Sequence, residues 1–319
     1  MSKGLLSNPI FHDETAAREW LEARIWKCGR NCPHCGVVGN STLLKGKSTR
    51  PGLYQCNEKE CRKPFTVTVG TLYERSKIPL HTWLAATQLL MSSKKGMSAL
   101  QIGRMLGVSP KSSWFLMHRI RESLRDTDLA PLGGEGKTVE ADETFIGGKE
   151  KNKHKKLRNK KNIGGMGKEA VFSLVERGGR VRSQRVATVA AKTLRPILVG
   201  QIDAATKLYT DDAGQYRHMG RDFSHDVINH SIDENVRGAC HTNTIESYFA
   251  TLKRGIVGTY HHVSPEHLKR YLAEFDYRHN ERSALEVDDK LRMEKSIPGI
   301  VGKRLTYRRT CREGEPVRG

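Results

Sequence analysis

Thr138-Val-Glu-Ala-Asp-Glu-Thr-Phe145 is the stretch that decides the fold. Its β-branched and aromatic residues predict a strand, and three carboxylates lie along it. Further strand-like runs follow at 170–175, 181–190, 207–210 and 226–229, and helical runs at 194–202, 244–256 and 265–279. Arg177-Gly178-Gly179 separates the first two of these runs as in a hairpin. The pattern predicts a mixed sheet with helices on both sides, the layering of an α/β domain.

The composition points to a polyanionic partner. Lysine and arginine number 55 against 35 acidic residues among 319, a net charge of +20, and the pI is about 9.8. A positive field attracts polyanions, so nucleic acid is the first expected partner and an anionic membrane surface the second. No apolar run reaches the ~18 residues of a membrane span, and residues 1–10 are too short and polar for a signal peptide. We therefore expect an intracellular protein without a membrane partner.

The cysteines predict a structural zinc site. Five of the seven lie between Cys28 and Cys61, and in a reducing compartment such clustering favours metal ligation over disulfides. Two cysteine pairs form short knuckles that supply four thiolates to one zinc ion: Cys32 and Cys35, and Cys56 and Cys61. Cys28 and His34 are the alternative ligands. We expect Tyr54 and Phe65 to pack on this ribbon.

A helix-turn-helix is predicted next. Residues 98–106 and 110–121 form two helical runs around Gly107, with Ser109 as a cap and Pro110 in the first turn of the second helix. The expected shared core is Leu100, Ile102, Leu106, Val108, Phe115 and Ile120. The side chains expected on the exposed sides, where some can meet DNA, are Lys111, Ser112, Ser113, His118, Arg119 and Arg121.

Carboxylates follow strands at two further places. Asp211 and Asp212 end the run at 207–210, and Glu246 opens the helix at 244–256. Strand ends present side chains to a crevice, where chemistry is usually placed on layered folds. A lone aspartate after a strand is more often a turn or cap residue, so the interpretation depends on the whole triplet Asp142, Asp211 and Glu246.

These motifs together resemble the DDE-type transposases of bacterial insertion sequences, in the group with an N-terminal zinc ribbon and a ribonuclease H-like catalytic domain. The resemblance covers nearly the whole chain, and its most specific parts are the two knuckles, Val139–Gly148 and His241–Gly255. It implies that Asp142, Asp211 and Glu246 are the metal-binding carboxylates, with Lys253 further along the same helix. Since some members of the group use an asparagine at the third position, Asn243 is the alternative third ligand.

The residue chemistry is consistent with this assignment. A site of oxygen ligands suits Mg²⁺ or Mn²⁺, and two such ions support in-line phosphoryl transfer without a protein nucleophile. Lys253 lies two helical turns after Glu246, where its ammonium can hold a phosphate. Arg254, beside it, is a further expected DNA contact.

A run of basic residues follows the first strand. Eight of the thirteen residues from Lys149 to Lys161 are lysine or arginine. Like charges repel, so we expect a solvated loop that becomes ordered on DNA beside Asp142. The residues of this run that we expect to contact DNA are Lys153, Lys155, Lys156, Arg158, Lys160 and Lys161.

The sequence thus predicts a multidomain α/β protein with four parts. These are the N-terminal helix and zinc ribbon (1–75), the helix-turn-helix region (76–128), a ribonuclease H-like mixed-sheet domain (129–290) and a basic tail (291–319). The predicted function is that of a transposase, an enzyme that binds double-stranded DNA at terminal inverted repeats and at a target. It would cleave and join strands with Mg²⁺ or Mn²⁺, contain structural zinc, form a homo-oligomer when two ends are paired, and act in the bacterial cytoplasm at the nucleoid.

Two other functions share some of these features. A non-catalytic DNA-binding regulator would use residues 1–125 beside a degenerate nuclease-like domain, and would have no reason to retain the acidic triplet. A structure-selective nuclease would share the metals without the paired end-recognition modules.

Overall fold

The structure is a computed structural model that describes residues 4–126, 130–148, 150–159, 165–229 and 236–306. Two compact units divide the chain. The terminal unit comprises Met1–Arg125 and Ser283–Gly319, and the sheet unit comprises Asp126–Arg282. The division between Arg125 and Asp126 lies three residues before the expected boundary between 128 and 129. None of the described helices is both long and apolar enough to cross a membrane.

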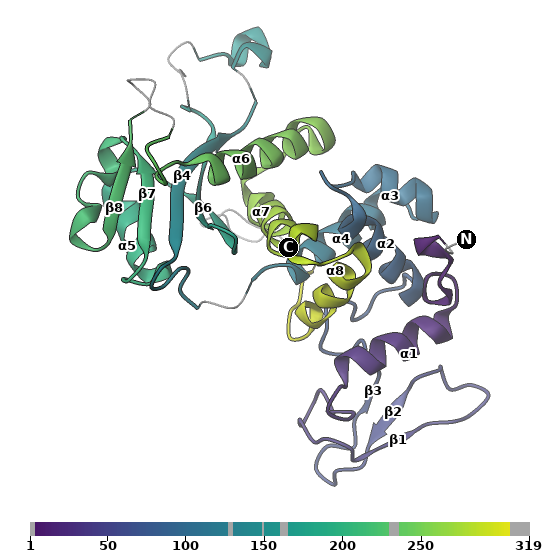
Figure 1. The fold of residues 1–319 in the computed structure, drawn as a ribbon. Coiled ribbons are helices and arrows are strands. Elements are labelled where there is room, and N and C mark those ends of the chain that lie inside the picture. Colours follow the sequence, from purple (N-terminus) through teal and green to yellow (C-terminus); the bar gives the residue numbers. More distant parts are fainter. Residues whose placement is uncertain (1–3, 127–129, 149, 160–164, 230–235, 307–319) are drawn as a thin grey trace. The chain divides into compact units, whose positions relative to one another are not determined.

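The sheet unit contains five strands in the spatial order β6-β5-β4-β7-β8 (Figure 1). The strands are β4 (Thr138–Ile146), β5 (Glu169–Glu176), β6 (Val181–Val186), β7 (Lys207–Asp211) and β8 (Ser224–Ile228). β4, β5 and β6 pair antiparallel, whereas β7 pairs parallel with β4 and β8 parallel with β7. The mixed sheet that the sequence predicts is therefore confirmed.

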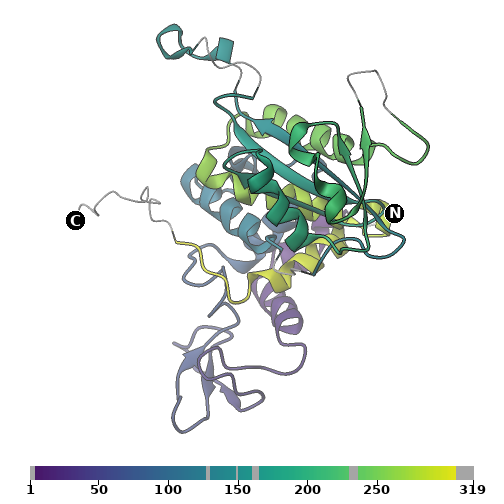
Figure 2. The ribbon, with the colours of Figure 1, turned by 90° about the vertical axis from the view of Figure 1, so that its left-hand side faces the viewer.

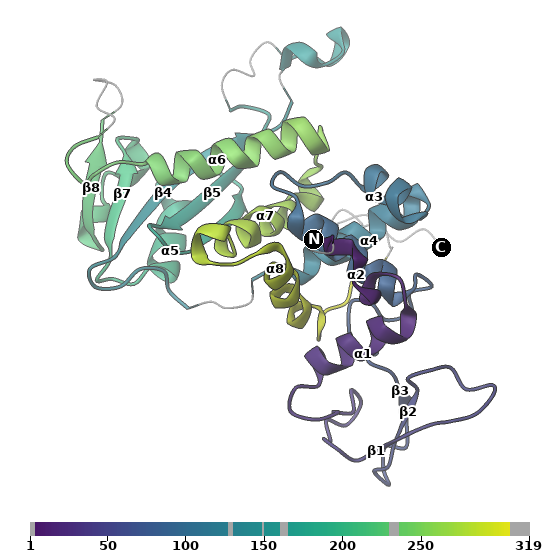
Figure 3. The same cartoon turned by 45° about the vertical axis from the view of Figure 1, so that its right-hand side comes forward.

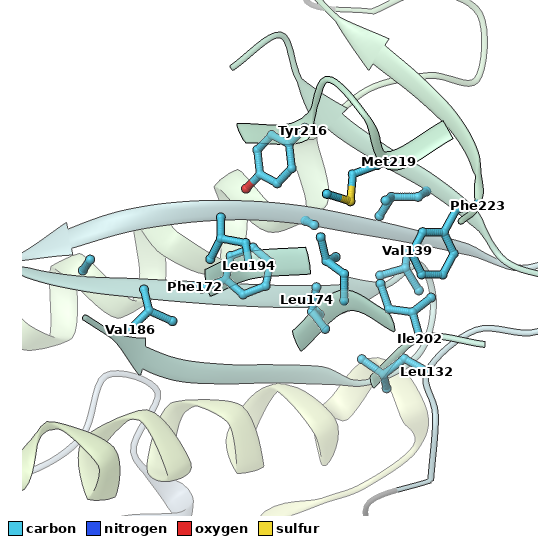
Figure 4. Close-up of a cluster of buried hydrophobic side chains, with 14 residues drawn as sticks. Leu132, Val139, Phe172, Leu174, Val186, Leu194, Ile202, Tyr216, Met219 and Phe223 are labelled. Carbon is cyan, nitrogen blue, oxygen red and sulfur yellow. The ribbon is translucent and has the colours of Figure 1, made fainter. Parts of the chain in front are cut away.

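Helices cover both faces of this sheet (Figures 2 and 3). α5 (Ala191–Gln201) packs on one face, where Leu194 and Leu198 bury against Ala141 and Phe172. Figure 4 shows this cluster, which Tyr216, Met219 and Phe223 complete. α6 (Asn243–Gly255) and α7 (Pro265–Asn280) pack on the other face against Val171 and Val175. Successive residues of β5 point to opposite faces and are apolar on both, whereas β4 places Glu140 and Asp142 on the face that α6 covers.

In the terminal unit, a helix precedes a small sheet. α1 (Glu14–Ile25) begins at Asp13, whose carboxylate accepts a hydrogen bond from the Ala16 amide at 2.6 Å. The antiparallel strands are β1 (Ser41–Leu43), β2 (Tyr54–Cys56) and β3 (Pro64–Phe65). Tyr54 and Phe65 are buried beside the cysteines, so they pack on the ribbon as expected.

Three helices then form the predicted helix-turn-helix region: α2 (Leu80–Ser92), α3 (Ala99–Leu106) and α4 (Pro110–Ser123). Gly107 ends α3 with a φ of 66°, a left-handed conformation that favours glycine. Ser109 caps α4 through the Ser112 amide, and Pro110 is the first residue of the helix. These turn residues act as the sequence predicts.

The packing of this region corrects several predicted side-chain positions. Leu100, expected in the core, is 58% exposed, because α3 buries Ile102 and Gly103 instead. Ser113, His118 and Arg121, expected on the exposed sides, are at most 1% exposed. Ser113 is internal because α3 and α4 approach closely there: its hydroxyl donates to the Ala99 carbonyl at 2.5 Å.

The C-terminal segment also differs from the expected basic tail at 291–319. α8 (Asp289–Ser296) and the turn η10 (Ile297–Ile300) belong to the terminal unit. Met293, Ile297 and Ile300 are buried, and the buried Arg292 donates to the Met91 carbonyl at 2.8 Å. Apolar residues spaced along this segment therefore form part of a core.

The remaining helical turns are short. They are η1 (Leu5–Ser7), η2 (Pro9–Phe11), η3 (Glu150–Asn152), η4 (Lys155–Leu157), η5 (Gly214–Tyr216), η6 (Met219–Arg221), the π-helical η8 (Ile256–Tyr260) and η9 (Ser283–Leu285).

Candidate active site and metal centre

Four cysteines of the ribbon form one cluster. The sulfur atoms of Cys32, Cys35, Cys56 and Cys61 all lie within 4.8 Å of one another. Cys32 Sγ lies 3.8 Å from Cys61 Sγ, and Cys35 Sγ lies 3.7 Å from Cys56 Sγ. A tetrahedron with zinc–sulfur bonds of about 2.3 Å has edges of about 3.8 Å, so the donor set fits zinc. Cys28 and His34 are exposed and lie outside this cluster.

The zinc assignment predicts the metal content of a cysteine variant. Purified protein should hold about one zinc ion per chain, and Cys56→Ser should lose most of it, because Cys56 is fully buried within the cluster. Mass spectrometry of the native protein measures the loss, with Cys28→Ser as the matched control that keeps its zinc. Full retention in Cys56→Ser would rule out the four-cysteine site.

The sheet brings the first two acidic residues of the triplet together. Glu140 in β4 is the register partner of Tyr209 in β7, and these strands run parallel. Asp142 and Asp211 each lie two residues beyond this pair, so both side chains point to the same face. Neighbouring strands are about 4.8 Å apart, which makes the two aspartates neighbours.

Glu246 comes to the same place from α6. It lies in the first turn, and its carboxylate accepts a hydrogen bond from the Thr242 hydroxyl at 2.9 Å. Asn243 is the first residue of the helix and is exposed, and Lys253 and Arg254 are exposed near its end. Among the described residues, the four cysteines are the one group of side chains whose ligand atoms are gathered closely enough to hold a metal ion. The carboxylate oxygens of the triplet are less tightly gathered.

The carboxylates of the triplet lie near enough to one another for their charges to interact. Burial, together with the negative charges of Glu143, Asp211 and Glu246, raises the pKa of Asp142 to about 7. Such crowding of negative charge at one carboxyl group is what a bound cation relieves. All the donors are oxygens, so the set suits a hard divalent cation such as Mg²⁺.

Glu143 is a fourth carboxylate that the sequence interpretation left without a role. It accepts hydrogen bonds of 2.5 Å from Gln215 Nε2 and from the Tyr216 hydroxyl. Burial raises its pKa, and the charge of Asp211 adds to this effect. The only feature of the sequence that indicates a role for Glu143 is its position directly after Asp142.

Glu140 and Arg177 are two further residues near the triplet without a predicted role. The Glu140 carboxylate is fully buried and accepts a 2.6 Å ion-pair hydrogen bond from Arg177 Nε. The alternation of Glu140 with Asp142 along one strand indicates a shared face, but no pattern in the sequence indicates Arg177 as the partner.

The predicted DNA-binding residues are only partly exposed. Lys111 and Ser112 are exposed at the start of α4, whereas Ser113 and Arg121 are buried and therefore cannot reach DNA in this conformation. Arg119 is half-buried, and its guanidinium donates to the Leu305 carbonyl at 3.2 Å.

The basic run after β4 contains the short turns η3 and η4. Lys155, Lys156 and Arg158 are exposed, and Lys153 pairs with Glu150 at 2.7 Å. Lys149, Lys160 and Lys161 lie outside the described residues.

Comparison with known proteins is in agreement with this architecture. Residues 131–280 match the ISXO2-like transposase domain, and residues 12–64 match the transposase zinc-ribbon domain. The chain is 28% identical over 279 residues to an uncharacterized protein in transposable element ISH50 of Halobacterium salinarum, covering 84% of this chain and 91% of that protein. The solved Mos1 transposase paired-end complex with left transposon end is 14% identical with a TM-score of 0.28, covering 67% of this chain and 75% of that chain.

A zinc ribbon followed by a mixed sheet with helices is consistent with a transposase fold. The two domain matches together cover more than half of the chain. The chain thus carries an ISXO2-like transposase domain and a transposase zinc-ribbon domain.

Proposed function

We propose that this protein is a transposase that cleaves DNA strands at the ends of its element and joins them to target DNA. The convergence of Asp142, Asp211 and Glu246 carries the proposal. Burial and the neighbouring negative charges, those of Asp211 and Glu246 included, raise the pKa of Asp142, and a purely structural domain has no evident need for such a cluster. The ISXO2-like transposase match over 131–280 spans all three residues.

Asp142, Asp211 and Glu246 would hold two Mg²⁺ or Mn²⁺ ions. When bound, such a pair activates a water or a 3′-hydroxyl and stabilises the departing oxygen of an in-line phosphoryl transfer. The carboxylates position the ions and balance their charge. Lys253, exposed on the helix that carries Glu246, would hold a phosphate of the strand being cut.

The terminal unit would recognise the element ends through the ribbon and the helix-turn-helix. Lys111 and Ser112 are the exposed residues at the start of α4 that would reach base edges. The residues that would contact phosphates are Lys153, Lys155, Lys156, Arg158, Lys160, Lys161 and Arg254. Pairing of two ends would require a homo-oligomer, and we propose that the protein acts at the nucleoid in the bacterial cytoplasm.

A cleavage assay tests the proposed activity. The purified chain is incubated with DNA that spans the junction of its element and the flanking sequence, in Mg²⁺ or in EDTA. The expected result is a new 3′-end at the junction in Mg²⁺ only, and no such product on DNA with a scrambled end. Specific binding without cleavage in either Mg²⁺ or Mn²⁺ would favour the non-catalytic regulator.

The DNA contacts predict two different binding defects. Replacing Lys155, Lys156 and Arg158 with alanine should weaken binding to all sequences and lower the slope of log K against log salt, because phosphate contacts release counterions. Lys111→Ala should instead reduce discrimination between end and random DNA, by about 1–3 kcal/mol. Fluorescence anisotropy at several salt concentrations measures both. Equal losses on both DNAs from both variants would contradict the division of roles.

A further inference from the structure

We infer that Glu140 and Arg177 are positioning residues that fix the start of α6, and with it Glu246, against the strands that carry Asp142 and Asp211. The inference rests on the proposed function, and it assigns a role to the ion pair of the buried Glu140 with the partly exposed Arg177, which lies outside the acidic triplet. The pair connects β4, the end of β5, β7 and the start of α6, and Glu140 and Tyr209 each lie two residues before an aspartate.

Glu140 holds the first turn of α6. One of its oxygens, Oε2, accepts a hydrogen bond from the Ile245 amide at 2.9 Å, and the other, Oε1, accepts one from the Thr244 hydroxyl at 2.9 Å. Ile245 directly precedes Glu246 in the chain. Asp142 lies two residues from Glu140, about 7 Å along the same face of β4. One carboxylate thus connects the backbone beside Glu246 to the strand beside Asp142.

Arg177 completes the connection from the end of β5. Its guanidinium donates to Glu140 at 2.6 Å, to the Ala239 carbonyl at 2.7 Å and to the His241 carbonyl at 2.8 Å. It also lies over the Tyr209 ring, 4.7 Å from the centroid, and Tyr209 is two residues before Asp211. Arg177 therefore contacts the segment before α6 and the strand that carries the second aspartate.

Apolar packing alone leaves the placement of α6 underdetermined. Ile245, Phe249 and Leu252 bury the helix against the sheet, but hydrophobic contact is non-directional and permits small shifts and rotations. Hydrogen bonds to the Ile245 amide and the Thr244 hydroxyl are directional. A fully buried carboxylate also tolerates little displacement, because losing its partners leaves a charge without compensation.

The test compares Glu140→Gln and Arg177→Lys with wild type and with the control Glu169→Gln. The control removes the carboxylate of another glutamate–arginine pair of the same sheet, Glu169 with Arg185. Arg177→Lys keeps the positive charge and loses the planar fork, so it is the milder change and decides the outcome if Glu140→Gln does not fold. All measurements are made on the full chain, well below its unfolding temperature.

Two readouts separate positioning from general stability. Amide hydrogen exchange should become at least tenfold faster at residues 243–247 and stay unchanged in β5. The affinity for Mn²⁺ without DNA, measured by electron paramagnetic resonance, should fall about 10- to 100-fold, the usual effect of displacing a group that orients metal ligands. Glu169→Gln should change neither readout by more than about twofold.

Unchanged exchange at 243–247, or unchanged Mn²⁺ affinity, in a folded variant would overturn the inference. Because neither readout uses DNA, the inference and the proposed function can fail separately. If Glu140→Gln lowers the affinity for Mn²⁺ but the wild-type protein cuts no DNA, the inference is supported and the proposed function is contradicted.

Discussion

Asp142→Asn is expected to abolish strand cleavage in Mg²⁺ while leaving the binding of element ends nearly unchanged. The amide keeps the shape of the side chain but removes the negative charge that would hold the metal ions. We expect a loss of roughly a thousandfold or more, the scale on which catalytic groups that act as a unit fail together. Gel assays of cleavage and binding on the same DNA measure the two effects. Cleavage within tenfold of wild type would contradict the assignment of Asp142.

The same variant should be more stable than wild type when metal is removed. The fold raises the pKa of Asp142 to about 7, well above the ordinary value near 4, so the folded state favours the protonated form. The associated stability is present below pH 4 and is lost as the pH rises through 7. Asp142→Asn cannot ionise, so its advantage should grow between pH 5 and pH 8, to the order of 1–3 kcal/mol. Denaturant unfolding in EDTA measures this difference, and equal stability at pH 8 would contradict the electrostatic account.

Glu246→Gln is the second variant with a large expected effect. A glutamate supplies negative charge and can bind a metal through both oxygens, whereas an asparagine offers one neutral oxygen. Glu246 also lies near enough to Asp142 for its charge to contribute to the raised pKa of Asp142. Glu246→Gln should therefore abolish cleavage in Mg²⁺, with at most partial activity in Mn²⁺. The Thr242 hydroxyl can still donate to the glutamine, so the fold should be retained.

Asn243→Ala is the matched comparison on the same helical turn. Asn243 is exposed and Thr242, not Asn243, is the capping residue of α6. The change should cost at most about 0.5 kcal/mol of stability, as at other surface positions, and cleavage should stay within a few-fold of wild type. A dead Asn243→Ala together with an active Glu246→Gln would reverse the assignment and make Asn243 the third ligand.

Local patterns in the sequence predicted the strands and the main helices of the sheet unit. Apolar residues on both faces of β5 bury it between the helices, and the cysteine spacing brings four sulfur atoms together. Turn chemistry is equally local, so the roles of Gly107, Ser109 and Pro110 follow from residue type. The register of β4 and β7 then places Asp142 beside Asp211.

What the sequence did not predict depends on contacts between distant residues. Arg177 meets Glu140 across the sheet, and no spacing encodes that pair. Arg121 lies in the same helix as Lys111, yet packing buries one and exposes the other. The segment after residue 283 is short and basic in composition, and only its contacts in the terminal unit show that Met293 and Ile297 are core residues.

Joining of a precleaved element end to plasmid DNA tests the central claim most directly, since it needs the metal site and a 3′-hydroxyl but no first cut. Wild-type protein should give joined products in Mg²⁺ and none in EDTA, and Asp211→Asn should give none in either while still binding the end. Joining by Asp211→Asn at the wild-type level, or no joining by wild-type protein that binds the end in Mg²⁺ and Mn²⁺, would contradict the account.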